Sequence, residues 1–391
     1  MEGLKPFDLR LVQRGARLRR SPFFAATQRH GARGYTVYNH MLFPICFADP
    51  EEEYWHLVNH VALWDVSVER QLEIAGPDAL AFANLLTPRD LSRCAVGQGK
   101  YVLITAEDGG IVNDPVLLRL AENRFWLSLA DSDVLLWARG VARSCGLRVE
   151  LSEPDVSPLQ VQGPRALEVM RALFGERVAA LRYYHFFEAK LDRIPLVVTR
   201  TGWTGELGYE IYLCDASRGD ELWERVMAAG KPFGIRPTGP CDIRRIEAGI
   251  LNWGADMTLE DNPYEVGLER LIDERKAADY IGRAALARIR AEGAKRRLAG
   301  IEIEGERIEF NATRWPVHVD GATIGCVTSA IWSPRLERNI GYAMLPAALA
   351  AVGMRLEVEV TGAGERPAKV VPLPFTTSPG RAGPSPSGKR G

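Results

Sequence analysis

The sequence predicts an α+β protein that carries a separate all-β domain at its C-terminal end. Up to about residue 290, alternating strand-like segments are interleaved with segments of helical periodicity, and no internal repeat is visible. From about Leu298, short strand-like segments are separated by Gly, Asn and Pro turns, as expected of a small β-barrel. With 391 residues, 46% of them hydrophobic and 25% charged, the chain is long enough for two or three domains with sizeable cores.

The amino-terminal elements follow from residue spacing. Residues 1–32 are rich in arginine, including the cluster Arg17–Arg20, and predict an extended basic arm. Apolar residues near i, i+3 and i+4 spacing over Glu51–Ser67 predict an amphipathic helix. Residues 70–76 alternate like a strand, and residues 77–87 resume helical spacing.

The next segments continue the same alternation. Residues 100–131 predict three successive strands, with a tight turn at residues 107–110. Residues 131–146 predict a helix that Gly146 ends. Strands and helices then alternate again over residues 157–275.

These elements divide the rest of the chain into three parts. After the arm, an α+β region of two subdomains is expected over residues 33–290, and a β-barrel domain over residues 295–375. The last stretch, residues 376–391, is rich in Pro, Gly and Ser, a composition that predicts a disordered tail.

Charge and cysteine usage exclude several classes of protein. The 49 basic and 50 acidic side chains balance, so the chain has no bulk attraction for nucleic acid or an anionic membrane. No apolar run approaches the roughly 20 residues that span a bilayer. The six cysteines form no C-x-x-C pair and no metal-ligand cluster, and no signal peptide precedes them. We therefore expect a cytoplasmic protein with reduced thiols and no bound metal.

One glycine-rich segment indicates a ligand. The sequence RTGWTGELGYEIYL runs from Arg200 to Leu213, and its three glycines permit a tight backbone that a flat ligand can approach closely. Trp203 can stack on such a ligand, and Glu206 is the acid of this turn that can accept two hydrogen bonds from paired donors. Both features suit a pterin-like heterocycle. The alternative is a plain hairpin turn with an exposed Trp.

The same segment resembles the folate-binding signature of the glycine-cleavage T-protein (aminomethyltransferase) superfamily, whose usual form is R-T-G-Y-T-G-E-x-G-[FY]-E. Other pieces are similar to that family in the same order: LLTPRDLS (85–92), GGIVNDPV (109–116), VQGP (161–164), RIEAGILNWGADM (245–257), NPYEVGL (262–268), YIGRAAL (280–286) and IGCVTSAIWSPRLERNIGYAML (324–345). The resemblance covers about residues 30–375. It implies a T-protein-like three-domain fold, in which two α+β parts enclose a central folate cavity and a C-terminal β-barrel covers it, with tetrahydrofolate as cofactor.

Within this superfamily, the amino-terminal half is similar to the tetrahydrofolate-dependent dimethylsulfoniopropionate demethylases. The segments that carry this resemblance are GYTVYNHMLFP (34–44), WDVSVERQ (64–71), LTPRDLS (86–92), NDPV (113–116), ADSDVLLWARG (130–140) and EPDVSPLQVQGP (153–164). T-proteins usually carry two acids where this chain has Asn113 and Asp114.

Two departures from these patterns stand out. Demethylases of this branch typically have Ser-Lys-Gln-Gly where this chain has residues 204–207 as TGEL, which keeps the folate-type acid Glu206. T-proteins have an Arg-Asp pair where this chain has Cys241 followed by Asp. The folate-holding role of that arginine would then pass to Arg244, Arg245 or another base.

The resemblance and the chemistry together indicate two catalytic residues. A folate nitrogen loses a proton when it is alkylated, and Asp114 stands in the acidic motif of the family to position or accept that proton. Asn113 would orient the ligand by hydrogen bonds but could not act as a base. For Asp114, which precedes a proline, a plain turn between strands is the alternative.

For the folate, the candidate binding residues are Trp203, Glu206, Arg200 and, by the resemblance, Tyr101. Arg200 and Arg89 either clamp carboxylates or pair with buried acids.

For the methyl donor, the candidate binding residues are Tyr35, Tyr38 and His40. Aromatic faces hold a methylated cation, so Tyr35, Tyr38 and Trp203 are suited to a donor of this kind. His40 would contact a substrate carboxylate. Ordinary core aromatics and a structural histidine are the alternatives at these positions.

The function expected from the resemblance is a tetrahydrofolate-dependent demethylase. It would move a methyl group from a small sulfonium or quaternary-ammonium zwitterion, best dimethylsulfoniopropionate, to give 5-methyltetrahydrofolate, with a small-molecule substrate and no nucleic-acid or membrane partner. A T-protein-type aminomethyltransferase, which would need a lipoyl carrier protein, is one alternative, and a non-catalytic folate-binding assembly factor is another. The sequence does not indicate whether the methyl group leaves sulfur, nitrogen or oxygen. It does not indicate the oligomeric state either.

Overall fold

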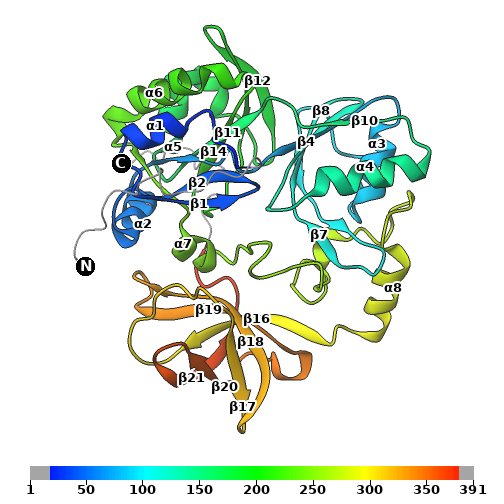
Figure 1. Ribbon diagram of the computed structural model, residues 1–391, viewed down its shortest axis with the longest axis vertical. Coiled ribbons are helices and arrows are strands. Elements are labelled where there is room, and N and C mark those ends of the chain that lie inside the picture. The colour runs from blue at the N-terminus through cyan, green and yellow to red at the C-terminus, as the bar shows by residue number, and fades with distance from the viewer. Residues whose placement is uncertain (1–17, 378–391) are drawn as a thin grey trace, which may run out of the picture.

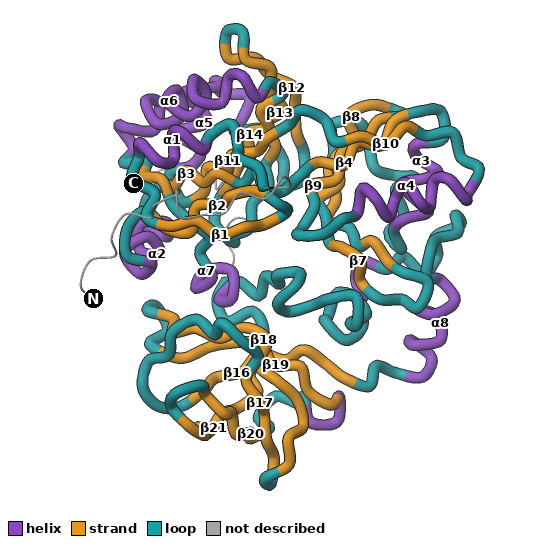
Figure 2. Tube along the Cα trace, in the orientation of Figure 1, coloured by secondary structure: helices purple, strands orange, loops and turns teal. Residues whose placement is uncertain are grey.

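The computed structural model describes residues 18–377 of the chain. They form two α+β units that lie side by side and a β-barrel beneath them, with the short helix α7 (Asp242–Glu247) between the first unit and the barrel (Figure 1). Long loops precede α8 (Arg283–Glu292), which leads the chain to the barrel (Figure 2). The predicted α+β class and the C-terminal barrel are confirmed.

The first unit is built on a six-stranded sheet in the order β12-β13-β14-β11-β3-β15. Neighbouring strands are antiparallel, except that β15 runs parallel to β3. The strands are β3 (Ala62–Asp65), β11 (Ser157–Gln162), β12 (Phe186–Leu191), β13 (Ile194–Thr199), β14 (Gly208–Leu213) and β15 (Arg236–Pro237). Its helices are α1 (Phe24–Arg29), α2 (Pro50–Asn59), α5 (Ala166–Phe174) and α6 (Gly219–Gly230).

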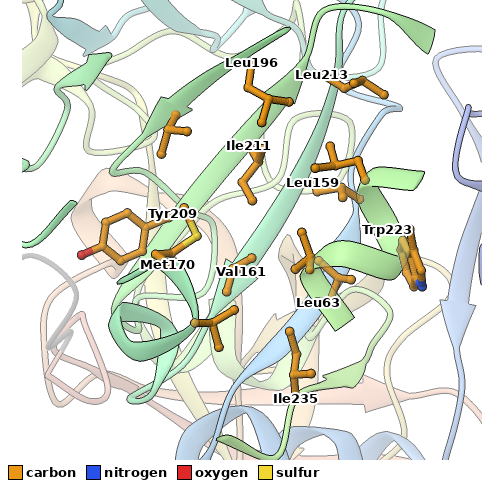
Figure 3. Close-up of a cluster of buried hydrophobic side chains, with 14 of the residues drawn as sticks. Leu63, Leu159, Val161, Met170, Leu196, Tyr209, Ile211, Leu213, Trp223 and Ile235 are labelled. Carbon is orange, nitrogen blue, oxygen red and sulfur yellow. The ribbon is translucent and has the colours of Figure 1, made fainter. Parts of the chain in front are cut away.

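One face of this sheet carries the largest apolar core. Leu159 and Val161 of β11 point to the side covered by α5 and α6, where they meet Met170 and Trp223 (Figure 3). Burial of each such side chain contributes about 1.5–3 kcal/mol. Because side chains alternate along a strand, Gln160 points to the opposite face. That opposite face carries the candidate site.

The second unit is built on a five-stranded antiparallel sheet in the order β10-β4-β9-β8-β5. The strands are β4 (Gln71–Ala75), β5 (Gly99–Tyr101), β8 (Val116–Ala121), β9 (Arg124–Ser128) and β10 (Glu150–Ser152). Helices α3 (Ala79–Leu86) and α4 (Val134–Cys145) share one apolar core with this sheet. Gly146 ends α4 in a left-handed conformation, φ 71°, as predicted.

Two hairpins and the barrel complete the fold. The hairpins are β1 (Gly34–Tyr38) with β2 (Met41–Cys46), and β6 (Ile104–Thr105) with β7 (Ile111–Asn113). The barrel closes in the order β16-β19-β18-β17-β20-β21. Its strands are β16 (Arg296–Ile303), β17 (Trp315–Val319), β18 (Ala322–Ser333), β19 (Arg338–Pro346), β20 (Arg355–Val360) and β21 (Gly364–Val371).

Two amino-terminal segments differ from the prediction. The helix expected over Glu51–Ser67 ends at Asn59, and β3 follows, because the apolar run after it is buried between β11 and β15. The described part of the expected arm is not extended. Residues 24–29 form α1, and Phe23 beside it is fully buried in the main core. Residues 1–17 lie outside the described residues.

Two further segments also differ. Residues 100–131, predicted as three strands, contain the shorter strands β6 and β7 as well, because the turn at residues 107–110 closes a separate hairpin. The expected tail from residue 376 begins in an ordered contact, since the backbone N–H of Thr376 donates to the carbonyl of Glu247 at 2.9 Å. Residues 378–391 lie outside the described residues.

Candidate active site

A buried polar row crosses the sheet face opposite the apolar core. Trp64, Gln160 and Glu210 are cross-strand partners on β3, β11 and β14. The Glu210 carboxylate accepts hydrogen bonds from the Gln160 amide at 2.7 Å, from the Thr201 hydroxyl at 2.6 Å and from the Tyr212 hydroxyl at 2.8 Å. Burial raises the pKa of Glu210, and these hydrogen bonds oppose that shift because they stabilise the carboxylate form.

An aromatic group lies on this row and includes two of the predicted residues. Trp203 packs on Trp64, with ring centroids 6.1 Å apart, and Trp64 stacks on Phe43 at 6.1 Å. Tyr38 lies 6.2 Å from Phe43 and belongs to the same cluster. The guanidinium of Arg245 lies 5.6 Å from the centroid of the Trp203 ring. The structure therefore brings Trp203 and Tyr38 together.

The turn of the hairpin that carries Tyr38 is fixed to the second α+β unit. Asn39 and His40 both have positive φ, 49° and 61°, as in a two-residue turn of type I′. The Asn39 side-chain amide donates to the carbonyls of Val68 and Leu129 at 2.9 and 3.2 Å. Sequence reasoning missed Asn39, although an Asn between two strand-like segments is a recognised signal for such a turn.

Asn113 is one of the two predicted catalytic residues, and its side chain forms hydrogen bonds within the protein. Its amide nitrogen donates to the Ala130 carbonyl at 3.2 Å and to the Ser132 hydroxyl at 2.7 Å. Its amide oxygen accepts the backbone N–H of Ala130 at 3.1 Å, and the side chain is fully buried. These contacts favour a positioning role for Asn113 over direct ligand contact.

Asp114 has the environment of a proton acceptor. The Tyr101 hydroxyl donates to its Oδ2 at 2.9 Å, and burial raises the pKa of Asp114 to about 7. The pKa of Tyr38 is raised as well, mainly by burial and to a smaller extent by the charge of Asp114. Arg89 lies beside the pair of Tyr101 and Asp114, since its Nη1 donates to the Tyr101 carbonyl at 2.5 Å.

Glu206 is buried, and its carboxylate is paired with Arg244. The Nε of Arg244 donates to Oε1 of Glu206 at 2.7 Å, and Arg244 also donates to the Thr376 hydroxyl at 3.1 Å and to the Thr377 carbonyl at 3.2 Å. Within residues 18–377, the hydrogen bonds to this carboxylate engage Oε1 alone. Oε2 is therefore available to a ligand donor.

Two arginines, Arg244 and Arg245, follow Cys241 on α7 and have different partners. Cys241 is buried, and burial raises its pKa to about 12. Arg244 lies beside Glu206, whereas Arg245 donates to Asp256 at 2.6 Å and to Ser329 at 2.9 Å, so it joins α7 to the barrel. Of the two arginines that the sequence left open, Arg244 is the one that contacts the folate-type acid.

Three other candidates lie in different surroundings. Arg200 is buried, and its Nη1 donates to the Leu181 carbonyl at 3.4 Å. Tyr35 packs against Phe24 at 5.1 Å, on the side of α1. His40 lines a cleft of about 290 Å³, and Tyr38, Asp114 and Trp203 are not among the residues that line it. These contacts place Arg200 beside Leu181, Tyr35 beside α1 and His40 at that cleft.

Other structural features bear on the class of protein. No helix in residues 18–377 combines the length and the apolar character that crossing a membrane requires. Over the same residues, no cluster of three or more His, Cys, Asp or Glu side chains is suited to hold a metal ion. All six cysteines are free thiols.

Comparison with known proteins identifies the class. Residues 23–276 match the GCVT N-terminal domain, and residues 296–376 match the glycine cleavage T-protein C-terminal barrel domain. The crystal structure of the glycine cleavage system aminomethyltransferase T from Bartonella henselae superposes with a TM-score of 0.82 at 25% sequence identity, covering 92% of this chain and 99% of that one. The chain belongs to the glycine-cleavage T-protein (aminomethyltransferase) family.

Two relatives place the chain more narrowly. The dimethylsulfoniopropionate demethylase DmdA of Ruegeria pomeroyi is 43% identical over 354 residues, which cover 90% of this chain and 96% of the relative. An aminomethyltransferase of Shouchella clausii is 34% identical, with 92% and 98% covered. The sequence is thus more similar to this demethylase than to this aminomethyltransferase.

Proposed function

We propose that the protein is a tetrahydrofolate-dependent demethylase that transfers a methyl group from dimethylsulfoniopropionate. The observation that carries this proposal is that the charge of a base, Asp114, acts on the hydroxyl of Tyr38, whose cluster also contains Trp203. An activated methyl donor needs a base for the departing proton and aromatic faces for its positive charge. The 43% identity to a demethylase supports the same donor.

The residues fit tetrahydrofolate on two counts. Trp203 is half-buried in a glycine-rich turn, where its ring packs on Trp64 with centroids 6.1 Å apart and is the aromatic proposed to contact the pterin. Glu206 keeps one carboxylate oxygen for the paired donors of a pterin, while Arg244 neutralises the other. When bound, tetrahydrofolate supplies the nitrogen nucleophile that accepts the methyl group.

The protein then has two tasks in the transfer. Tyr38 and Trp203 hold the methylated cation, at about 0.5–2 kcal/mol for each aromatic face. Asp114 takes up the nitrogen-bound proton as the carbon–sulfur bond breaks and the carbon–nitrogen bond forms, and its pKa of about 7 matches that role at neutral pH. Tyr101 holds the Asp114 carboxylate in place. The sulfur leaves as a neutral thioether, so no covalent enzyme intermediate is needed.

Two further parts of the proposal concern partners and location. The donor is a free small molecule, and no lipoyl carrier protein takes part. The six free thiols support a reducing compartment, for which we propose the cytoplasm.

The test is a direct assay of product. Purified protein is incubated with tetrahydrofolate and, separately, with dimethylsulfoniopropionate, glycine betaine or dimethylglycine, and 5-methyltetrahydrofolate is measured by mass spectrometry. We expect product with the sulfonium donor. Product from a nitrogen donor alone would support methyl transfer to tetrahydrofolate but would show that dimethylsulfoniopropionate is not the substrate. Methylenetetrahydrofolate formed only with an aminomethylated lipoyl carrier protein would establish an aminomethyltransferase instead.

A further inference from the structure

Glu69 lies next to the aromatic group but has no part in the proposed transfer. It follows Val68 in the connection between the two large sheets, and its backbone N–H donates to the Val66 carbonyl at 2.9 Å. Val66 and Val68 are buried in the same cluster as Tyr38 and Trp203. The Val68 carbonyl accepts from Asn39, the residue after Tyr38, at 2.9 Å. The hairpin turn thus holds Glu69 beside Tyr38.

The Glu69 carboxyl faces other acids. Burial, followed by the charges of Glu210 and Asp114, raises the pKa of Glu69 well above its usual range. Glu69 in turn contributes to the raised pKa of Tyr38 and of Tyr212. The Arg245 guanidinium, 5.6 Å from the centroid of the Trp203 ring, is paired with Asp242 and Asp256. Glu69, Glu210 and Asp114 therefore lie near one another, and burial with their mutual repulsion favours the neutral form of Glu69 while the site is empty. A cationic ligand beside these acids would favour the carboxylate form of Glu69.

Two buried polar atoms beside these acids also lack partners. Gln160 is 1% exposed and donates to Glu210, but its Oε1 has no hydrogen-bond partner in residues 18–377. Trp64, its cross-strand neighbour, is 3% exposed, and its Nε1 has no partner there either. A buried polar atom without a partner costs about 1–3 kcal/mol, so such atoms call for an explanation, and a ligand in the site is one.

We propose that Glu69 is the residue that selects a positively charged methyl donor. Its carboxylate, backed by Glu210, lies against the sulfonium or ammonium centre that the faces of Tyr38 and Trp203 surround. This inference rests on the proposed function and adds a residue for substrate selectivity. The same charge interaction explains why the thioether product is released. Methyl transfer removes the positive charge from sulfur, so the neutral thioether no longer has an attraction to Glu69.

Ligand binding without folate tests this inference separately from turnover. Calorimetry would compare the affinities of dimethylsulfoniopropionate and of its demethylated thioether, which carry the same carboxylate and differ in the charge on sulfur. We expect the wild-type protein to prefer the sulfonium, and Glu69→Gln to lose about tenfold in sulfonium affinity while its thioether affinity stays unchanged. Glu150→Gln, which alters an exposed carboxyl on β10, is the matched control and keeps the preference.

Each remaining outcome is decisive. Glu69→Asp retains the charge, so it should recover most of the preference even if Glu69→Gln folds poorly. Equal losses for both ligands, or an unchanged preference in Glu69→Gln, would overturn the role of Glu69. If wild-type protein prefers the sulfonium and Glu69→Gln loses that preference, but no 5-methyltetrahydrofolate forms, the proposed reaction fails and the selectivity of Glu69 stands. If wild-type protein shows no preference, the inference fails whatever the turnover.

Discussion

Asp114 gives the reaction a pH dependence that a variant can remove. Burial raises its pKa to about 7, so the carboxylate form needed to accept a proton becomes dominant above neutral pH. We predict that kcat rises through about pH 7 in the wild-type protein. Asp114→Asn should lower kcat by about 10²–10⁴-fold and remove this limb of the profile. Folate affinity should be largely retained, and undiminished turnover would make Asp114 a turn residue.

The same group links stability to pH. The folded-state pKa of about 7 lies above the ordinary value of 3.8, so the folded protein binds more protons than the unfolded chain between these pH values. The contribution of Asp114 to the free energy of unfolding is fully present below about pH 4 and falls as the pH rises through 7. Thermal unfolding of Asp114→Asn should lack this component, which the difference in melting temperature between pH 5 and pH 8 would reveal.

At Glu206 we predict a selective loss of folate binding. Glu206→Ala removes the oxygen proposed for the pterin and leaves buried Arg244 with only the more distant carboxylate of Glu247, at 3.7 Å, among its described ion pairs. The dissociation constant for tetrahydrofolate should rise far more than that for dimethylsulfoniopropionate, as measured by calorimetry. Glu206→Gln keeps the shape and serves as the matched variant. Equal losses for both ligands would mean that Glu206 supports the whole site and does not read the pterin.

Among the secondary-structure elements, the hairpin β1-β2 depends on Asn39. This side chain joins the turn to Val68 and to Leu129, and its own backbone has positive φ. Asn39→Ala removes these hydrogen bonds and the side chain that tolerates a positive φ. Tyr38 should then lose its fixed position. We predict a raised KM for the methyl donor with the folate KM unchanged. Asn39→Asp retains the preference for a turn but lacks the side-chain N–H donor. An intermediate effect of this variant would separate the contribution of the backbone turn from that of the side-chain hydrogen bonds.

The C-terminal end of α3 is held by a buried lysine. The Nζ of Lys276, a residue that is 2% exposed, donates to the carbonyls of Asn84 and Thr87, each at 2.6 Å. Burial lowers its pKa to about 8. Lys276→Met leaves these carbonyls unsatisfied, so we predict a loss of several kcal/mol in the free energy of unfolding by urea. Lys295→Met, at an exposed lysine, is the control and should change little.

The elements that the sequence predicted well are those with a single strong periodicity. The helix over residues 131–146 has a clear helical spacing and a terminal glycine, and α4 occupies most of that range. β3 was missed because Ala62–Asp65 is buried on both faces, so it lacks the alternation that marks a strand. α1 was missed because an arginine-rich segment can still bury Phe23 and Ala26.

The residues of the candidate site also divide into those that the local sequence indicates and those that it does not. Trp203 and Glu206 share one glycine-rich turn, so the sequence alone could nominate both. The pairing of Glu206 with Arg244 joins segments 38 residues apart, and the pairing of Asn39 with Leu129 joins segments 90 residues apart. No local spacing encodes such contacts. Only the packed arrangement of sheets and hairpin could reveal them.

For the whole molecule, α7 joins the first α+β unit to the barrel through buried charges. Arg245 donates to Asp256 at 2.6 Å and to Ser329 of β18 at 2.9 Å, and it is fully buried. Removing one partner of a buried ion pair costs about 3–5 kcal/mol because the other charge remains. Arg245→Met should therefore lower the urea midpoint strongly. The double variant Arg245→Met with Asp256→Leu should recover part of the loss, whereas additive losses would contradict the pairing.

The contacts of Arg244 have a consequence for how the protein is made. Its partner Glu206 leaves the ribosome well before Thr376, whose hydroxyl accepts a hydrogen bond from Arg244. Because domains fold as the chain emerges, both α+β units can form while the barrel is still being synthesised. The surroundings of Arg244 are completed only when the segment after the barrel docks on α7. We therefore expect nascent chains that stop short of Thr376 to fold their α+β units while Arg244 still lacks this hydrogen bond.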